Sequence, residues 1–340
     1  NVTGVVFKMR TVHCLHEQHY RHAHLYPEYV GVKVVPFFVD KKSQLGKFTA
    51  SSKRLDRCDP TTIEARSLQI LRYLILYNIC PNITLLYKYF RCPDLNILKK
   101  NPLFNRLIED QEKRTIRRDV LVIVSEYSDL GSLRAWRMEG AAAYATSQWK
   151  SIIFQVVYTL AVLQDLLEFR HNDLHQANIL LSSCPDTTKT IRYTVGGLNY
   201  YLRHAGILVR LWDFDWCYCK NLLENFKVSR GKSSVDTNTP RHFDLHRFLN
   251  HVYCSQKGHV PKEVRKFIQN VYPTEYLGQN SSQLKTYRLK KDANLAPIPT
   301  PIDLLRHSYF EEYFDHGGLP FFRGTGATYV MGTKLSNLFS

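Results

Sequence analysis

The residues with the clearest chemical potential lie in a short polar segment, 171–178, which is followed by the apolar run 179–181. In this segment Asp173 stands five residues before Asn178. A carboxylate there can accept the proton of an attacking hydroxyl, and an amide oxygen can hold a metal ion on phosphate groups. The spacing therefore indicates phosphoryl transfer.

A second acidic position follows another apolar run. Residues 209–212 are Val-Arg-Leu-Trp, and Asp213 comes directly after them. A carboxylate at the end of a strand can bind a hard cation such as Mg²⁺ through its oxygens. Asp213 is therefore the second candidate metal ligand, beside Asn178.

The first third of the chain, which must help to position these residues, is rich in predicted strands. Apolar or alternating runs predict strands at 4–9, 29–35, 83–90 and 120–127. We expect Pro36 to close the second of them. The signal Asp59-Pro60 predicts a helix from Thr61 onward, and the charged stretch 106–118 predicts an inserted loop or an exposed helix.

Beyond Gly131 the pattern becomes mainly helical. Apolar stripes at helical spacing predict helices at 147–168, 243–253 and 261–271. The stretch 182–207 predicts a β-hairpin built around Tyr193 and Tyr200-Tyr201. The change in pattern places a boundary near residues 128–131.

Taken in order, these motifs resemble the protein-kinase superfamily, with the catalytic loop written His-Asn-Asp rather than His-Arg-Asp. The other matching motifs are Lys33 in a Val-Gly-Val-Lys strand, Glu64 in the next helix, the hinge-like segment 124–133, Asp244 and the segment 301–310. The match covers about residues 1–310. Within the superfamily, the segments 79–83, 210–216 and 244–250 resemble the serine/threonine kinases of nucleocytoplasmic large DNA viruses.

The resemblance implies an α+β class and a bilobal protein-kinase-like fold, with a β-rich N-lobe and a mainly helical C-lobe. The N-lobe would cover residues 1–127, with a truncated start and insertions near 40–58 and 104–118. The C-lobe would cover 128–340, with the catalytic loop at 171–178 and a C-terminal extension after about residue 310.

The resemblance also implies ATP and Mg²⁺ as cofactors and assigns the chemistry to particular residues. Lys33, oriented by Glu64, would hold the α- and β-phosphates, and Asn178 and Asp213 would bind the metal ions. Asp173 would orient and deprotonate a serine or threonine hydroxyl. His175 stands where serine/threonine kinases carry a lysine and could hydrogen-bond the γ-phosphate.

The adenine site is implied in the same way. Its expected residues come from the remnant of the glycine-rich loop, the lysine strand, the gatekeeper, the hinge and the strand after the catalytic loop. They are Gly4, Val6, Gly31, Ser125, Glu126, Ser128 and Leu180.

Several positions depart from the kinase pattern. Asn1 replaces a second glycine of the glycine-rich loop, and Asp215 replaces the glycine of Asp-Phe-Gly, which removes backbone freedom there. Asn172 replaces the catalytic-loop arginine, which leaves no cation for a phosphorylated activation loop. We therefore expect activity without activation-loop phosphorylation.

Composition limits the partners. Lys and Arg number 46 against 30 Asp and Glu, a net charge of +16, which predicts attraction to phosphates, acidic proteins or anionic surfaces without choosing among them. With the kinase resemblance, an acidic protein substrate is expected. The viral resemblance adds virion or capsid proteins as expected partners, whereas nucleic acid is suggested by charge alone, without a motif. We expect no membrane span. The eight cysteines lack a Cys-x-x-Cys pair and favour free thiols, which predicts an intracellular protein rather than a secreted one. The viral resemblance implies the host cytoplasm or the virion as the location.

Two other functions remain open at this point. A small-molecule kinase is one, because the His-x-Asp-Leu-His pattern also occurs in haspin-like and aminoglycoside-kinase-like members. A catalytically weak pseudokinase with a structural role in the virion is the other, because of Asn1 and Asp215. Retention of all five residues Lys33, Glu64, Asp173, Asn178 and Asp213 favours an active protein kinase.

Overall fold

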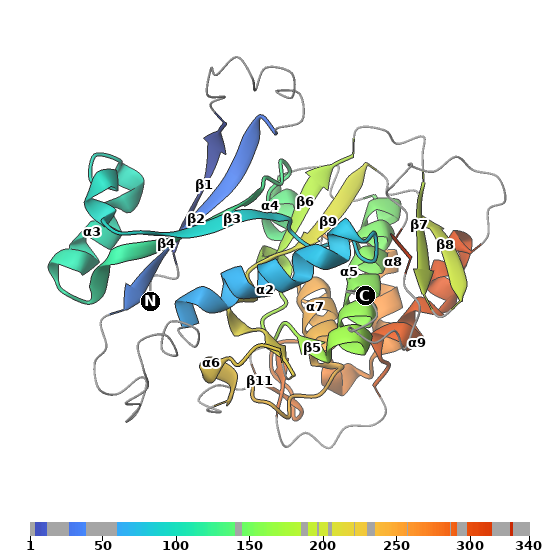
Figure 1. Cartoon of the computed structure of the whole chain (residues 1–340). Coiled ribbons are helices and arrows are strands. Elements are labelled where there is room, and N and C mark those ends of the chain that lie inside the picture. The colour runs from blue at the N-terminus through green and yellow to red at the C-terminus, as the bar shows by residue number, and fades with distance from the viewer. Residues whose placement is uncertain are drawn as a thin grey trace, which may run out of the picture. The chain divides into compact units, whose positions relative to one another are not determined.

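The computed structural model of the chain is a mixed α/β protein (Figure 1). It describes residues 4–11, 27–38, 60–139, 145–184, 190–195, 197–202, 206–220, 222–229, 235–256, 258–285, 287–290, 298–314 and 327–328. The position Asn1 and the expected insertion at 40–58 lie outside these ranges. The chain divides into two compact units, one comprising residues 1–69 and 84–127 and the other residues 70–83 and 128–340.

The first unit contains an antiparallel sheet with strand order β1-β2-β4-β3. Its strands are β1 (Val5–Arg10), β2 (Tyr29–Phe38), β3 (Leu86–Cys92) and β4 (Ile116–Glu126). All four predicted strands are present, but the expectation that Pro36 closes the second one is wrong. Pro36 still pairs with Val120 on β4, and the register then shifts before Phe38. Because Pro36 lies past Val34, the last β2 residue paired with β1, its missing N–H breaks no β1–β2 bond.

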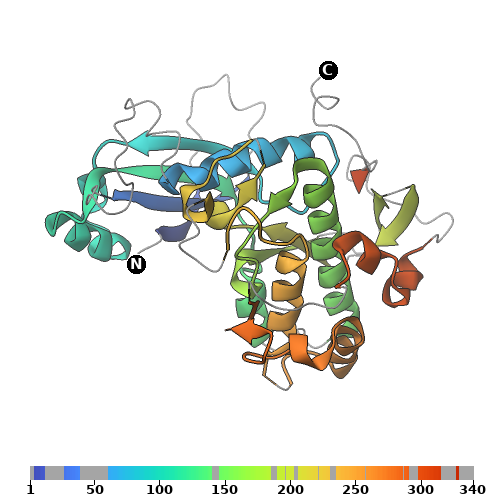
Figure 2. The same ribbon diagram turned by 90° about the horizontal axis from the view of Figure 1, so that it is seen from below.

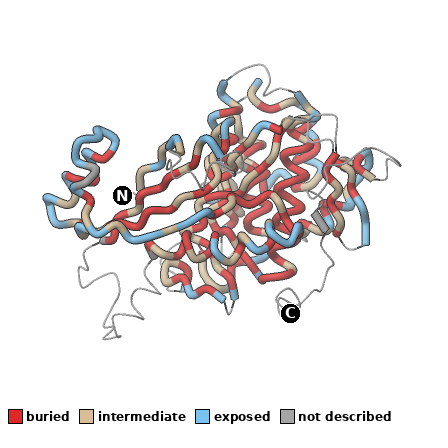
Figure 3. Tube along the Cα trace, turned by 45° about the horizontal axis from the view of Figure 1, so that its top comes forward, coloured by how far each residue is buried: buried red, intermediate tan, exposed pale blue. Residues whose placement is uncertain are grey.

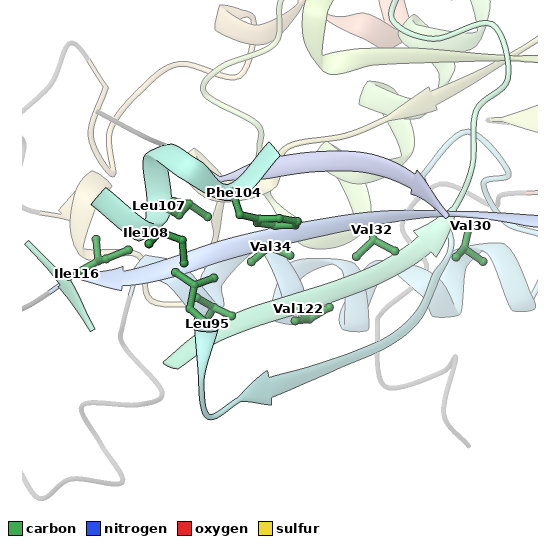
Figure 4. Packing of buried hydrophobic residues seen from close by; sticks show 10 residues of the cluster. Val30, Val32, Val34, Leu95, Phe104, Leu107, Ile108, Ile116 and Val122 are labelled. Carbon is green, nitrogen blue, oxygen red and sulfur yellow. The ribbon is translucent and has the colours of Figure 1, made fainter. Parts of the chain in front are cut away.

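One face of this sheet carries a hydrophobic cluster that also includes residues from the β3–β4 connection (Figure 4). The connection contains the 3₁₀ helices η2 (Leu95–Leu98) and η3 (Pro102–Phe104) and the helix α3 (Asn105–Glu112). Leu107 and Ile108 of α3 are buried, and the Phe104 ring meets the Phe7 ring edge-on at 5.6 Å. The stretch 106–118 is therefore a helix with one buried face followed by the start of β4, rather than a loop.

The helix α2 (Pro60–Leu76) contributes residues to both units. It forms where the sequence predicts it, because Ile63, Leu68 and Leu71 recur at helical spacing and are buried. Asn78 ends it in the left-handed conformation, with φ of 55°. The amide of Ile79 then donates to Leu74 O at 2.8 Å, which closes the last turn.

The second unit is organised around the helix α5 (Thr146–Leu167), which is buried along most of its length (Figure 3). The helix α7 (Phe243–Tyr253) runs beside it (Figure 2). The other helices of this unit are α4 (Leu133–Met138), α6 (Phe226–Ser229), α8 (Lys262–Val271) and α9 (Pro301–Leu305). The short 3₁₀ helices are η5 (Gln176–Asn178), η6 (Phe214–Trp216), η7 (Thr274–Tyr276) and η8 (Ser308–Tyr313).

Within the described ranges, α5 is the one helix long and apolar enough to cross a membrane. Of its most apolar 18-residue window, 89% is buried inside the protein. A helix that is apolar on every side is expected wherever it is packed on every side. Because α5 is buried inside the protein, its length and apolar composition are only weak evidence for a membrane span.

Short strand pairs complete the second unit. These are β5 (Phe169–Arg170) with β10 (Tyr218–Cys219), β6 (Ile179–Ser183) with β9 (Ile207–Leu211), β7 (Ile191–Val195) with β8 (Leu198–Leu202), and β11 (Leu284–Lys285) with β12 (Arg288–Leu289). The strand β13 (Ala327–Thr328) pairs with β7. The predicted hairpin in 182–207 is confirmed as β7–β8. Tyr193 and Tyr200 anchor it, with ring centroids 5.4 Å and 5.2 Å from that of Phe154 on α5.

Acidification is expected to destabilise this unit through His246 on α7. Its Nε2 donates to Tyr276 O at 2.7 Å, and burial lowers its pKa from 6.5 to about 4. In the unfolded chain His246 is therefore protonated below about pH 6.5, whereas in the folded chain it is protonated only below about pH 4. The contribution of His246 to stability is therefore fully present above pH 6.5 and is lost at about 1.4 kcal/mol per pH unit as the pH drops towards 4.

Urea unfolding at about pH 7.5 and about pH 5 measures this effect. His246→Gln keeps a donor for Tyr276 O but has no group that titrates in this range, so its stability should depend less steeply on pH. His259→Gln, which removes a half-buried histidine from the same unit, is the control. Equal pH dependence in wild type and His246→Gln would contradict the assignment.

Candidate functional site

The segment 171–178 forms a loop between β5 and β6, and both of its ends are fixed by strand pairing. At its end, the amide of Asn178 donates to His175 O at 2.9 Å. The carbonyl of Asn178 accepts from the amide of Trp212 at 3.1 Å. This last bond brings the residue before Asp213 against Asn178, so the two predicted metal-binding segments lie side by side.

Asp244 on α7 holds the start of the loop. Its two carboxylate oxygens accept from the amides of His171 and Asn172 at 2.6 Å and 2.7 Å. The side chain is fully buried, and burial raises the pKa of its carboxyl, while His171, the two amides and Arg247 act in the opposite direction. These bonds hold Asn172 in the left-handed conformation, with φ of 63°. The loop shape therefore depends on a carboxylate supplied by a distant helix.

The carboxylate of Asp173 is held by two arginines through one of its oxygens. Arg247 Nη2 lies 2.5 Å and Arg288 Nη2 lies 3.1 Å from Oδ1. The other oxygen, Oδ2, lies 3.5 Å from Asn178 Nδ2 and 3.6 Å from His175 Nε2. Asn178 Nδ2 also donates to Asp173 O at 3.0 Å. The structure thus brings Asp173, His175 and Asn178 together, as the sequence predicts.

His175 is held as a neutral side chain. Its Nδ1 accepts from the amide of Ala177 at 3.2 Å, so the proton of the neutral ring lies on Nε2, the atom nearer to Asp173. Burial lowers the pKa of His175; the Asp173 carboxylate opposes this shift and Arg247 adds to it. A neutral donor therefore stands where serine/threonine kinases carry a charged lysine.

Asp213 follows β9 in the left-handed conformation, with φ of 63° and ψ of 66°. Its neighbours are fixed by His171, whose Nε2 donates to Trp212 O at 2.9 Å and whose ring lies 5.1 Å from that of Phe214. The rings of His171 and Phe214 therefore pack together beneath the loop. In the described part of the chain, no three His, Cys, Asp or Glu side chains form a metal-binding group.

In the first unit, Lys33 of β2 and Glu64 of α2 form a buried ion pair. Lys33 Nζ lies 2.5 Å from Glu64 Oε2, and the two side chains are 6% and 3% exposed. A lysine on an apolar strand more often extends to solvent. Burial of both charges is compensated only by close pairing, so the pair fixes the position of the Lys33 ammonium group.

The other residues predicted to bind nucleotide in the first unit lie on neighbouring strands. Gly31 pairs with Ser125 across β2 and β4, and a Cβ on Gly31 would lie 3.2 Å from Glu126 O. Val6 is exposed and pairs with Lys33. Gly4 adopts a φ of 129°, and a Cβ there would lie 2.8 Å from Val34 O, which makes glycine necessary. Their part in nucleotide binding stays a prediction.

In the second unit, Ser128 and Leu180 lie where the hinge-like segment meets β6. Ser128 Oγ accepts from Ser182 Oγ at 3.2 Å, and Leu180 forms a β-bridge with Ser132. Glu126, at the end of β4, accepts from the amide of Leu85 at 2.8 Å. Each residue predicted for the hinge is thus held by a hydrogen bond or β-bridge to a neighbouring segment.

Comparison with known proteins supplies the family. The family model described as poxvirus serine/threonine protein kinase matches residues 135–315. This range contains the segment 171–178, Asp213 and Asp244. The chain belongs to the poxvirus serine/threonine protein kinase family.

Individual relatives are also kinases by name. The R400 protein of Acanthamoeba polyphaga mimivirus, provisionally named a serine/threonine-protein kinase, is 26% identical over 300 residues, which cover 80% of this chain and 62% of R400. The chain therefore spans less than two thirds of that relative. The serine/threonine-protein kinase haspin of Mus musculus is 32% identical over 96 residues, or 28% of this chain and 12% of haspin. The Bos taurus haspin is 33% identical over 99 residues, or 29% and 12%.

In this member of the kinase family, the structure adds functional candidates that the sequence did not single out. Arg247 lies three residues after Asp244 on α7, so helical spacing alone could have indicated that both face the loop. Arg288 contacts Asp173 across 115 positions of the chain, without any local sequence signal.

Asp215, which replaces the glycine of Asp-Phe-Gly, forms an ion pair and accepts a hydrogen bond at its backbone carbonyl. Lys227 Nζ of α6 lies 2.6 Å from Asp215 Oδ2, and Asn225 Nδ2 donates to Asp215 O at 3.0 Å. Asn172 Nδ2 donates to Trp216 O at 3.0 Å, so the residue that replaces the catalytic-loop arginine holds this segment through its amide. Activity without activation-loop phosphorylation stays a prediction.

Proposed function

We propose that the chain is an ATP-dependent protein kinase that transfers the γ-phosphate to serine or threonine hydroxyls of protein substrates. The observation that carries the proposal is the environment of Asp173, whose Oδ1 is held by two arginines while its Oδ2 has longer contacts at 3.5 Å and 3.6 Å. A fixed carboxylate with one oxygen that the arginines do not hold can orient a hydroxyl and accept its proton. Membership of the kinase family supports this role.

The donor set suits Mg²⁺. Asn178 uses its amide nitrogen on Asp173, so its amide oxygen is the atom left to act as a ligand. Asp213 would supply carboxylate oxygens, and both are the hard donors that Mg²⁺ prefers. When bound, Mg²⁺ would neutralise charge on the phosphates of ATP. Asn178 and Asp213 are therefore the residues proposed to hold it.

Nucleotide binding is assigned to both units. Lys33, held by Glu64, would bind the α- and β-phosphates. Gly4, Val6, Gly31, Ser125, Glu126, Ser128 and Leu180 are proposed for the adenine and ribose. The kinase family supports the bilobal arrangement that such a site requires.

A protein is the favoured acceptor. The relatives whose names state an activity are serine/threonine-protein kinases, and the net charge of +16 would attract acidic proteins. Catalysis on a small molecule is the second candidate, because the catalytic loop carries His-x-Asp-Leu-His.

The test is transfer of labelled γ-phosphate from ATP to casein, a basic protein, an aminoglycoside and choline in parallel. We expect Mg²⁺-dependent labelling of protein on serine or threonine. Excess EDTA should reduce it to background, and added Mg²⁺ should restore it, because the phosphate charge would otherwise be uncompensated.

The other outcomes separate the alternatives. Labelling of a small molecule alone would replace the protein-kinase assignment by a small-molecule kinase. No transfer to any acceptor, together with no thermal shift on addition of Mg·ATP, would leave a pseudokinase with a structural role.

A further inference from the structure

Two arginines converge on a single oxygen of Asp173, but their surroundings differ. The Arg247 side chain is 5% exposed and comes from α7, whereas the Arg288 side chain is 29% exposed and comes from the β11–β12 hairpin. Burial lowers the pKa of the Arg247 guanidinium, and the Asp173 carboxylate opposes that shift. Burying a guanidinium without partners destabilises the fold. The two groups that accept hydrogen bonds from Arg247 therefore indicate its role.

Those acceptors are consecutive residues of the catalytic loop. Arg247 Nη1 donates to Asn172 O at 2.9 Å, and Nη2 lies 2.5 Å from Asp173 Oδ1. Asp244, one turn earlier on α7, accepts from the amides of His171 and Asn172. The helix therefore holds the loop through an acidic side chain that binds N–H groups and a basic side chain that binds a carbonyl and a carboxylate.

This arrangement fixes the orientation of the Asp173 carboxylate. Its Oδ1 has two charged donors, and the nearest donors to Oδ2 lie at 3.5 Å and 3.6 Å. A carboxylate oxygen accepts about two hydrogen bonds, so Oδ2 is the oxygen with room for a substrate hydroxyl. Because the two carboxylate oxygens are equivalent, a half turn about the Cβ–Cγ bond restores the Arg247 contact, whereas any smaller rotation breaks it. The contact therefore fixes the plane of the carboxylate.

We propose that Arg247 is a positioning residue for phosphoryl transfer, which holds Asp173 with Oδ2 towards the acceptor hydroxyl. This inference rests on the proposed protein-kinase function. Arg288 contacts the same oxygen, but its side chain is 29% exposed and lies on the β11–β12 hairpin. Arg247 contacts both the loop carbonyl and the carboxylate, and its side chain is the more buried of the two arginines.

The proposal is tested with Arg247→Met, which keeps much of the side-chain volume and removes the guanidinium. Transfer to casein should fall about 100-fold in kcat, the size expected from a misplaced reacting group, with KM for ATP within about 2-fold. Arg247→Lys should recover part of kcat, because a lysine ammonium keeps the charge but cannot bridge two acceptors in a fixed fork.

Arg265→Met is the matched control. Arg265 is also a partly buried arginine that donates to backbone carbonyls, those of Tyr253, Ser255 and Gln256 at the end of α7, but these lie outside the loop. Its loss should lower the thermal unfolding temperature without a comparable loss of kcat. Equal falls of kcat in Arg247→Met and Arg265→Met would overturn the proposal.

A double-mutant cycle with Asp173→Asn separates positioning from general support of the fold. If Arg247 acts through Asp173, Arg247→Met should cause little further loss in the Asp173→Asn background. Full additivity would overturn the proposal, as would wild-type kcat in Arg247→Met. Should Arg247→Met fail to unfold cooperatively, Arg247→Lys takes its place in the same cycle. Absence of transfer by the wild type would instead contradict the proposed function itself.

Discussion

Asp173→Asn should lower kcat for phosphate transfer by about 10³-fold, within the range that general-base groups contribute, while the chain stays folded. The asparagine oxygen can keep the contacts with Arg247 and Arg288, because both arginines are donors. Its NH₂ group then occupies the place of Oδ2, where it would present a donor to the hydroxyl instead of an acceptor. The loss should therefore fall on kcat rather than on nucleotide binding.

Labelled transfer and Mg·ATP-induced thermal shift, measured on the same preparation, check this expectation. Asp303→Asn is the matched control, because Asp303 belongs to the capping box of α9 and accepts from Thr300 rather than from the loop. It should lose some stability and keep kcat. Wild-type transfer by Asp173→Asn would remove the basis for the proposed mechanism.

The sequence was sufficient for those parts of the fold and site that depend on local pattern. The helices α5, α7 and α8 lie within one or two residues of their predicted bounds, and α2 begins one residue before its predicted start, because their apolar stripes face a core. The proximity of Asp173, His175 and Asn178 follows in the same way, because they lie within six positions and one short loop brings them together. Their catalytic roles stay a prediction.

Long-range contacts account for what the sequence analysis missed. Nothing near Arg288 indicates that a hairpin 115 residues away from Asp173 turns its guanidinium onto that carboxylate. The buried face of α3 was also missed, since its eight residues carry two apolar side chains, Leu107 and Ile108, among charged neighbours. In that case the sheet, rather than the helix sequence, decides which side chains are buried.

The end of the strand β2 also differs from the prediction, and strand pairing explains why. Pro36 was expected to end its strand because proline lacks an amide hydrogen. In the structure, β2 continues to Phe38, since β4 supplies pairing partners beyond the point where β1 stops contributing them. The consequence of a proline thus depends on which neighbouring strand is present at that register, which the local sequence does not contain.

Lys33→Met should abolish transfer and also destabilise the first unit by about 3–5 kcal/mol, because the buried Glu64 carboxylate then loses the Lys33 ammonium group. Lys220→Met is the control for loss of an ion pair as such. Its partner is Glu168 at 3.1 Å, and the two side chains are 51% and 45% exposed. An exposed pair of this kind contributes at most about 1 kcal/mol, so the urea midpoint should change little.

The double variant Lys33→Met/Glu64→Met distinguishes a catalytic ion pair from a structural one. Replacing both charges with apolar side chains removes the buried charge, so the free energy of unfolding should return close to the wild-type value. Transfer should remain lost, because no cation is left to bind the α- and β-phosphates. If transfer returned together with stability, Lys33 would be part of the core of the first unit and not of the nucleotide site. A double variant that is stable but inactive would instead show that the two charges are needed for transfer and not for folding, because an apolar pair stabilises the fold equally well.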